Sequence, residues 1–353
     1  MTSVARPATA RPAGAGHHNA LNAIRLLLAG LVIVTHTGSA PWDGEGWIAG
    51  DTLGGWAVSG FFAISGYLVA LSRSRTTLAD YLRRRAVRIF PGYWFSLVVI
   101  TAVVAPLSAW WTGAHWEFGS AAGYVARNAT LVQVQPGIEQ TLTQAPYPLV
   151  WNLSAWTLAY EFACYLILGV LLPRASGARA VVVSAALLGL CTLVSMPRFK
   201  PALPYEVFTL ARLGTYFFAG ALLLVLGGRV RWTPRIALAS MLAIVALGWA
   251  GRLTWLGALP IAFLVLWLGR SLPTRLGSTH DVSYGVYLYG FPAQQLLTAY
   301  GPWNQGAYFA AVLAMATGLA WISWLVIERP SMRWRRSLSA TPQPPPRADQ
   351  VGS

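Results

Sequence analysis

Arg25 and His36 are the two residues whose types and spacing most clearly suggest chemistry. The residues between them are mostly apolar, which predicts one continuous helix. Eleven helical residues advance about 16 Å and rotate about 20° past three full turns, so both side chains project from one face at two depths. An imidazole at its ordinary pKa of about 6.5 is largely neutral near pH 7 and could act as a general base. The structural alternative places the two groups at opposite membrane interfaces, with no role in catalysis.

Arg85 and Arg88 end a basic run that begins at Arg83 and precedes Ile89-Phe-Pro-Gly-Tyr-Trp94. Guanidinium groups bind phosphates through paired hydrogen bonds, so this run could clamp an anionic ligand. The same run is typical of a positively charged cytoplasmic anchor beside an aromatic belt. The two interpretations are compatible with each other.

Glu161 is the carboxylate that the sequence places deepest inside an apolar segment. A charged group there costs roughly 3 kcal/mol or more, so it needs a partner or a purpose. Glu161 could orient a catalytic histidine such as His36. It could also be a structural ion-pair partner, with Arg212 of another segment as the candidate cation.

Composition indicates that these residues act within a lipid bilayer. The chain has 353 residues, of which 56% are hydrophobic and only 10% are charged, whereas soluble domains carry roughly 25% charged residues. A soluble enzyme is therefore excluded. The net charge of +15 comes from basic residues that alternate with apolar segments, as cytoplasmic loops do, so no nucleic-acid partner is expected. Cys164 and Cys191 both lie in apolar runs, and no metal site or nucleotide-binding glycine loop is recognised.

Ten apolar segments are predicted to be helices, because a segment isolated in lipid must satisfy its own backbone hydrogen bonds. The glycines and serines of Ser59–Gly66 are expected to let helices approach closely. The separation between the seventh and eighth segments rests only on a turn near Trp249–Arg252. The segments are residues 20–38, 47–72, 87–108, 147–172, 179–196, 205–227, 234–250, 253–269, 281–299 and 304–327.

The basic residues predict the orientation of this all-α polytopic membrane protein. Twenty Arg residues lie at the termini and in the even-numbered gaps, against four basic residues in the odd-numbered gaps. This asymmetry predicts an even number of spans, with both termini cytoplasmic and residues 110–146 outside. The expected organisation is a disordered tail at 1–18, a ten-helix domain at 19–335 and a disordered Pro-rich tail at 336–353. A cleavable signal peptide ending near Ala40 is the alternative for the first span, and it would discard His36.

Six motifs together resemble the integral-membrane acyltransferase family 3, the bacterial glycan O-acyltransferases that use acyl-CoA or a similar thioester. The resemblance runs from about Asn22 to Met332. Two departures are the Asn22 and Gly290 positions, where family members often have Asp and His. The first departure leaves Arg25 without the acidic neighbour expected on its own helix. The motifs are, in order, Leu21-Asn-Ala-Ile-Arg25 with His36, Phe61-Phe-Ala-Ile-Ser-Gly-Tyr67, Arg85-Ala-Val-Arg88 with Ile89-Phe-Pro-Gly-Tyr-Trp94, Leu153-Ser-Ala-Trp-Thr-Leu-Ala-Tyr-Glu161, Ser283-Tyr-Gly-Val-Tyr-Leu-Tyr289 with Phe291-Pro292, and Ile327-Glu-Arg-Pro330.

The resemblance implies an O-acyltransferase of the inner (cytoplasmic) membrane, with acetyl as the expected acyl group. Acyl-CoA would be the co-substrate, and the acceptor would be a glycan, a lipid-linked oligosaccharide or a glycosylated small molecule. His36 would be the general base or the acyl carrier. Arg25 would contact the donor or an oxyanion, and Arg85 with Arg88 would hold the phosphates of CoA.

A transporter or flippase of a polysaccharide precursor is the alternative function. Such a protein would also show many helices with buried Arg, His and Glu, used as an ion or proton path. It should form no acyl-CoA-dependent product. No convincing internal repeat supports this alternative.

Overall fold

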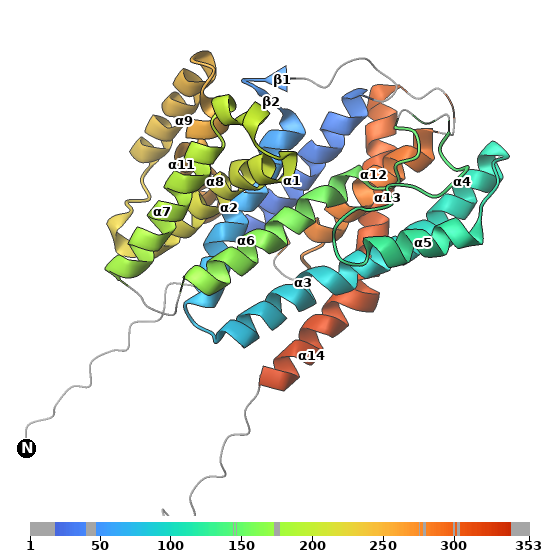
Figure 1. The fold of residues 1–353 in the computed structure, drawn as a ribbon, viewed down its shortest axis with the longest axis horizontal. Helices are drawn as coiled ribbons and strands as arrows, with labels where there is room; N and C mark the ends of the chain where they lie inside the picture. Colours follow the sequence, from blue (N-terminus) through green and yellow to red (C-terminus); the bar gives the residue numbers. More distant parts are fainter. Residues whose placement is uncertain are drawn as a thin grey trace, which may run out of the picture.

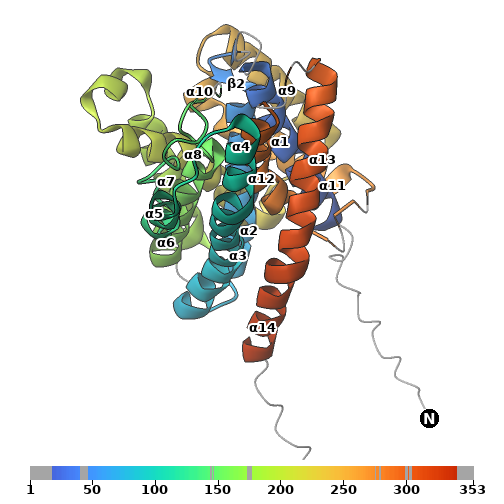
Figure 2. The same cartoon turned by 90° about the vertical axis from the view of Figure 1, so that its right-hand side faces the viewer.

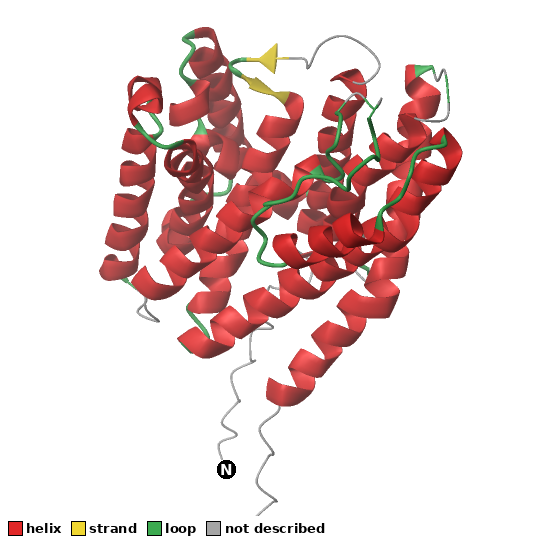
Figure 3. Ribbon diagram, turned by 45° about the vertical axis from the view of Figure 1, so that its right-hand side comes forward, coloured by secondary structure: helices red, strands yellow, loops and turns green. Residues whose placement is uncertain are grey.

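The computed structural model describes residues 18–39, 47–143, 145, 147–172, 177–274, 276–277, 280–298, 301 and 304–339. Helices lie along all ten predicted segments, so the all-α prediction is confirmed (Figures 1 and 3). Of the predicted tails at 1–18 and 336–353, residues 1–17 and 340–353 lie outside the described residues, whereas residue 18 and residues 336–339 are helical, contrary to the prediction. The helices are α1 (His18–Ser39), α2 (Leu53–Arg73), α3 (Leu78–Val99), α4 (Ala105–Thr112), α5 (Phe118–Asn128), α6 (Thr157–Leu171), α7 (Ala178–Val194), α8 (Tyr205–Leu226), α9 (Pro234–Trp249), α10 (Leu253–Leu256), α11 (Ala258–Ser271), α12 (Ser283–Thr298), α13 (Gln305–Ser323) and α14 (Arg329–Ser339).

Short non-α segments join or precede several of these helices. The π-helical turns Ile100–Val104 and Trp324–Glu328 make α3–α4 and α13–α14 two continuous rods. The 3₁₀ turns are Leu153–Trp156, Pro197–Ala202 and Gly227–Arg229. Helix α14 reaches Ser339, past residue 335 where the predicted membrane domain ends.

Length and composition make this a multi-pass membrane protein. In the described part of the chain, five helical segments are long and apolar enough to cross a bilayer, and four shorter apolar helices accompany them. The number of spans and the cytoplasmic placement of both termini remain predictions. The long segments are Leu53–Arg73, Leu78–Thr112, Leu153–Leu171, Tyr205–Arg229 and Gln305–Trp334, and the shorter ones are Ala20–His36, Ala178–Val194, Pro234–Trp249 and Ala258–Ser271.

The helices pack as a bundle around α1, α2, α8 and α12. Helix α2 contacts α1 and α8, and α1 also contacts α12. Helix α12 is buried at every residue from Ser283 to Leu296, so its tyrosines and glutamines face other helices. The rod α13–α14 runs along one side, and α14 lies at the end of the bundle opposite the β-hairpin (Figures 1 and 2).

Three predicted helix starts are wrong: α3 begins at Leu78, before the predicted residue 87, and two other helices begin late. Trp47–Ile48 (β1) and Asp51–Thr52 (β2) form an antiparallel hairpin, and α2 begins only at Leu53. The cause is a local cap, since the Thr52 hydroxyl accepts a hydrogen bond from the Gly55 N–H at 3.0 Å. The predicted segment at 147–172 likewise begins its helix late, with the 3₁₀ turn at Leu153. Sequence reasoning also missed α5, within the predicted outer loop.

The other two local predictions are confirmed. Helix α9 ends at Trp249, and α11 then packs back against it, as the turn near Trp249–Arg252 predicted. Within Ser59–Gly66, Ala63 and Gly66 lie in close backbone contact with α8, and Gly60 lies against Leu28 of α1.

The α2–α8 contact should tolerate no added methyl group. A Cβ at Gly66 would lie 1.8 Å from the Phe217 carbonyl oxygen, and one at Gly220 would lie 2.0 Å from that of Ala63. We expect Gly66→Ala and Gly220→Ala each to lower stability by about 1–3 kcal/mol or more through overpacking, seen as a lower thermal unfolding midpoint in detergent. Gly189→Ala on α7 is the matched control, because a Cβ at that position would meet no atom within 4 Å. Unchanged midpoints for both contact variants would contradict this packing.

The predicted orientation can be tested by cysteine labelling in a background lacking Cys164 and Cys191. Glu139 and Arg75 are both exposed, and they lie in the loops predicted to be outside and inside. A membrane-impermeant maleimide added to intact cells should label Glu139→Cys and spare Arg75→Cys. Labelling of Arg75→Cys alone would show that the protein has the opposite orientation in the membrane.

Candidate active site

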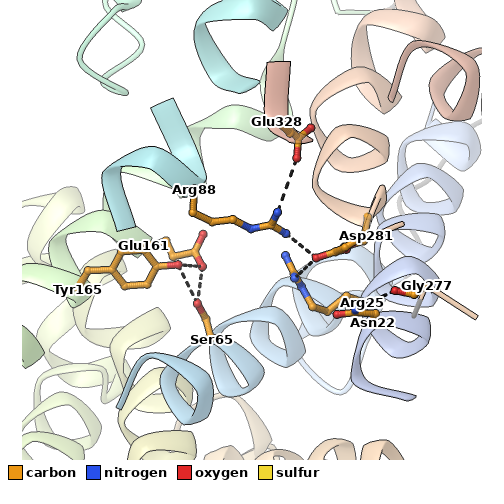
Figure 4. Close-up of polar contacts among 10 residues, drawn as sticks. Asn22, Arg25, Ser65, Arg88, Glu161, Tyr165, Gly277, Asp281 and Glu328 are labelled. Atoms are coloured by element: carbon orange, nitrogen blue, oxygen red, sulfur yellow. Dashed lines mark hydrogen bonds and ion pairs between the residues drawn. The ribbon is translucent and has the colours of Figure 1, made fainter. Parts of the chain in front are cut away.

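Arg25 and Arg88 meet on a single carboxylate oxygen, although they come from different helices. Arg25 Nη1 of α1 lies 2.9 Å from Asp281 Oδ2, and Arg88 Nη2 of α3 lies 2.6 Å from the same atom (Figure 4). Asp281 directly precedes α12, and its Oδ1 accepts a hydrogen bond of 2.6 Å from the Ser283 hydroxyl. Three segments far apart in the sequence are thereby joined at one point.

This arrangement corrects the expectation drawn from Asn22. Arg25 has an acidic partner, supplied by Asp281 rather than by its own helix. Asn22 instead donates from Nδ2 to the Gly277 carbonyl oxygen at 2.9 Å (Figure 4). It therefore anchors the segment that carries Asp281.

Arg88 also faces a second carboxylate, that of Glu328. Its Nη1 lies 3.7 Å from Glu328 Oε2, and Glu328 is only 4% exposed. Glu328 ends the π-helical turn Trp324–Glu328, and such insertions are frequent at functional sites. No hydrogen-bond donor among the described residues reaches Oε2. The nearby charge of Arg88 is therefore the main interaction that offsets the burial of this oxygen.

Glu161 binds two hydroxyl groups. Its Oε1 accepts hydrogen bonds from the Ser65 hydroxyl at 2.5 Å and from the Tyr165 hydroxyl at 2.6 Å (Figure 4). The suggested ion pair with Arg212 is not formed, because Arg212 pairs with Asp51 of the hairpin. The sequence could not foresee this, since Asp51 reaches Arg212 only after the hairpin has displaced the start of α2.

One cavity of about 90 Å³ brings together four of the five predicted site residues, namely Arg25, Arg85, Arg88 and Glu161. The Arg85 guanidinium carbon lies 5.9 Å from the centroid of the Tyr165 ring. Apart from these charged residues, the lining is mostly apolar and aromatic. That remainder includes Val58, Phe61, Phe62, Ile64, Leu68, Val69, Leu158, Tyr284 and Tyr287. Such a lining suits a ligand with an anionic end and a less polar arm.

His36 is not among the residues that line this cavity. It lies eleven residues beyond Arg25, about 16 Å along α1. Its Nδ1 is 2.9 Å from the Val32 carbonyl oxygen, which can only accept, so Nδ1 carries the proton and the neutral ring keeps its basic lone pair on Nε2. The imidazole packs edge-on against Phe291 of α12, with ring centroids 5.3 Å apart.

The structure therefore does not bring Glu161 to His36. Glu161 shares the cavity with Arg25, at the other depth of α1. Between the two depths, the rings of Phe61 and Tyr287 meet with centroids 5.6 Å apart, and the Tyr287 hydroxyl donates to the Ser154 carbonyl oxygen at 2.6 Å. Both rings also line the arginine cavity.

Sequence reasoning missed Asp281, Glu328, Ser65 and Tyr165 as members of the site. The signal that could have found them was their position within motifs. Asp281 begins an unusually aromatic segment, Glu328 lies where the last apolar segment ends, and Ser65 lies among small residues. Each looked like an interface or packing residue on its own.

Comparison with known proteins gives a consistent result. A family model described as an acyltransferase domain matches residues 18–327. An O-acetyl transferase of Shigella phage Sf6 is 27% identical over 326 residues, covering 88% of this chain and 95% of that protein. Nodulation protein 10 of Rhizobium leguminosarum bv. viciae is 30% identical over 369 residues, covering 92% of this chain and 96% of that protein. No solved structure matches the chain.

Proposed function

This chain belongs to the integral-membrane acyltransferase family 3, and from that premise we propose that it moves an acyl group from acyl-CoA to a hydroxyl of a glycan or glycosylated metabolite. Membership makes it a membrane O-acyltransferase, an enzyme that transfers groups other than aminoacyl groups. A transporter or flippase function is not favoured. The donor, the acceptor and the residue roles below are the proposal.

The convergence of three arginines in an enclosed cavity is the observation that carries this proposal. Arg25, Arg85 and Arg88 come from two helices and line one cavity. Among the ion pairs of the described residues, none involves Arg85, so its guanidinium is available to an incoming anion. Guanidinium groups bind phosphate in a bidentate manner. We assign the diphosphate of CoA to this part of the cavity.

The distance along α1 supports separate roles for Arg25, which would bind the donor, and His36, which would act at the thioester. The separation of about 16 Å is comparable with an extended phosphopantetheine arm. A donor held by its phosphates at the arginines would carry its thioester toward His36. Arg25 is then a donor contact, because it lies too far from His36 to stabilise an oxyanion there. The apolar and aromatic wall between the two levels would enclose the arm.

His36 would supply proton transfer. Its Nε2 lone pair takes the proton of the acceptor hydroxyl, the hydroxyl oxygen attacks the thioester carbonyl carbon, and the CoA thiolate leaves and is protonated. A positioned base of this kind contributes about 10² to 10⁴ in rate. A covalent acyl-histidine relay, in which Nε2 attacks first, uses the same geometry. Glu161, bound by Ser65 and Tyr165, belongs to the donor cavity in this proposal.

The acyl group is expected to be acetyl, in line with the name of the phage relative, and the site of action is the inner membrane. The test compares surface glycans and secreted glycosylated metabolites by mass spectrometry, in cells with and without the gene. Loss of a fixed acyl mass from one compound would name both acceptor and acyl group. Identical mass profiles, in cells that make the protein, would reject the proposed acceptor class.

A further inference from the structure

We propose that Asp281 determines which anions the donor cavity accepts, because its carboxylate already binds Arg25 and Arg88, two of the arginines that a donor phosphate must use. The inference rests on the proposed function, in which Arg25 and Arg88 bind donor phosphate. Asp281 competes with the donor phosphate for these two arginines. A ligand with several phosphates displaces the Asp281 carboxylate, whereas a single phosphate does not.

The contacts of Asp281 are those of a bound anion. A single oxygen, Oδ2, takes Arg25 at 2.9 Å and Arg88 at 2.6 Å. The two guanidinium groups come from α1 and α3, and both line the donor cavity, whereas Asp281 lines a neighbouring pocket. Figure 4 shows the contacts of both arginines meeting at one oxygen of the carboxylate. A phosphate that reaches these guanidinium groups from the donor cavity would compete with Asp281 for them.

The charges of the site favour displacement. Arg25, Arg85 and Arg88 contribute three positive charges, and Asp281, Glu161 and Glu328 are three nearby carboxyl groups. An added phosphate brings further negative charge into a low-dielectric environment, which is costly. Release of Asp281 from Arg25 and Arg88 frees two guanidinium groups for the phosphate and lowers that cost.

Asp281 is the carboxylate best able to move. It belongs to the non-helical residues 280–282 before α12, and its side chain is 19% exposed. Glu161 lies within α6, where Ser65 and Tyr165 both bind it. Glu328 is 4% exposed within a helical rod. Glu161 cannot move away without losing both of its hydroxyl hydrogen bonds, and Glu328 has little exposed surface through which to move away.

Selectivity follows from the position of Arg85. A single phosphate that replaces Asp281 exchanges one anion for another at Arg25 and Arg88, with little gain. A diphosphate also reaches Arg85, for which no carboxylate partner is found in the described residues. Only the larger ligand gains a contact that offsets the displacement of Asp281.

The experiment measures binding of CoA and of inorganic phosphate to the purified full-length protein and to Asp281→Asn. In Asp281→Asn no carboxylate competes for Arg25 and Arg88, so this variant should bind CoA at least about tenfold more tightly than the wild type. A factor of this size corresponds to one charge-assisted contact. Inorganic phosphate should compete with CoA for Asp281→Asn at concentrations that leave the wild type unaffected. Ser283→Ala removes the hydrogen bond to Oδ1 and should shift both affinities in the same direction by a smaller factor.

Asp80→Asn is the matched control, because Asp80 pairs with Arg83 at 2.9 Å outside the cavity, and its affinities should equal those of the wild type. Weaker or unchanged CoA binding by Asp281→Asn would overturn the inference and make Asp281 a support for the arginines. If Asp281→Asn does not fold, Ser283→Ala decides between the same two outcomes. If the wild type binds no CoA, the proposed donor fails, and phosphate binding by Asp281→Asn still tests the competitor role.

Discussion

Replacement of His36 with alanine should abolish acyl transfer while the protein remains inserted, folded and able to bind acyl-CoA. The expected loss is about 10² to 10⁴ in rate, the contribution of a general base. Donor binding should persist because His36 lies about 16 Å along α1 from Arg25 and does not line the arginine cavity. The measurement pairs the rate of acyl transfer with the dissociation constant for CoA.

His36→Gln separates chemistry from shape. Glutamine can still donate to the Val32 carbonyl oxygen, but it has no basic nitrogen to take a proton, so this variant should be as inactive as His36→Ala. His115→Ala is the matched control, since His115 is exposed in the loop that follows α4, and it should keep wild-type rates. Near wild-type transfer by a folded His36→Ala protein, or a mature N-terminus that begins after Ala40, would remove His36 from the mechanism.

Arg88→Ala should have the second-largest effect, and it should act on both folding and donor binding. Removal of Arg88 leaves Glu328 without its cation and leaves Asp281 with Arg25 alone. Breaking a buried pair in this way typically costs about 3–5 kcal/mol, so the thermal unfolding midpoint should fall sharply. Arg88→Lys should recover only part of the loss, because an ammonium group cannot reach two carboxylates in the fork geometry of guanidinium.

Arg85→Ala provides the contrast to Arg88→Ala. Arg85 contacts the Tyr165 ring and takes part in none of the ion pairs found among the described residues, so its loss should weaken CoA binding with little change in stability. A contribution of roughly 1.5–3 kcal/mol to donor binding is expected for one charge-assisted contact. If Arg85→Ala and Arg88→Ala lose equal stability, Arg85 is a structural residue of the positively charged cytoplasmic anchor rather than a donor contact.

The helical architecture could be predicted because it follows from local composition. An apolar segment in lipid has no other way to satisfy its backbone, so each of the ten predicted segments contains a helix, whereas the more polar α5 was missed. The start of α2 could not be placed from hydropathy, because Trp47 and Ile48 are apolar and yet form a strand. Its position depends on the Thr52 cap and on the pairing of Asp51 with Arg212, 161 residues away.

The sequence pointed to four residues of the cavity, Arg25, Arg85, Arg88 and Glu161, but it missed their partners Asp281, Glu328, Ser65 and Tyr165. Helical geometry along α1 gives the depths of Arg25 and His36 without reference to any other segment. The depth of Glu161 relative to them depends on how α6 slides against α2, which the sequence does not encode in any local pattern. Sequence reasoning therefore leaves His36 and Arg212 as alternative partners of Glu161, whereas the fold places Glu161 in the cavity with Arg25. Asp281 and Arg25 are 256 residues apart, so their contact also required the packed bundle.

Turnover of isotope-labelled acetyl-CoA by the purified protein in a lipid bilayer tests the central claim most directly. A glycan extract from the host is supplied as acceptor, and wild type, His36→Ala and Arg85→Ala are compared. The account predicts alkali-labile label on a glycan with the wild type, no transfer with His36→Ala at undiminished CoA binding, and transfer by Arg85→Ala only at raised donor concentration. Wild-type protein that neither binds CoA nor moves the label, or His36→Ala protein that moves it at the wild-type rate, would contradict the account.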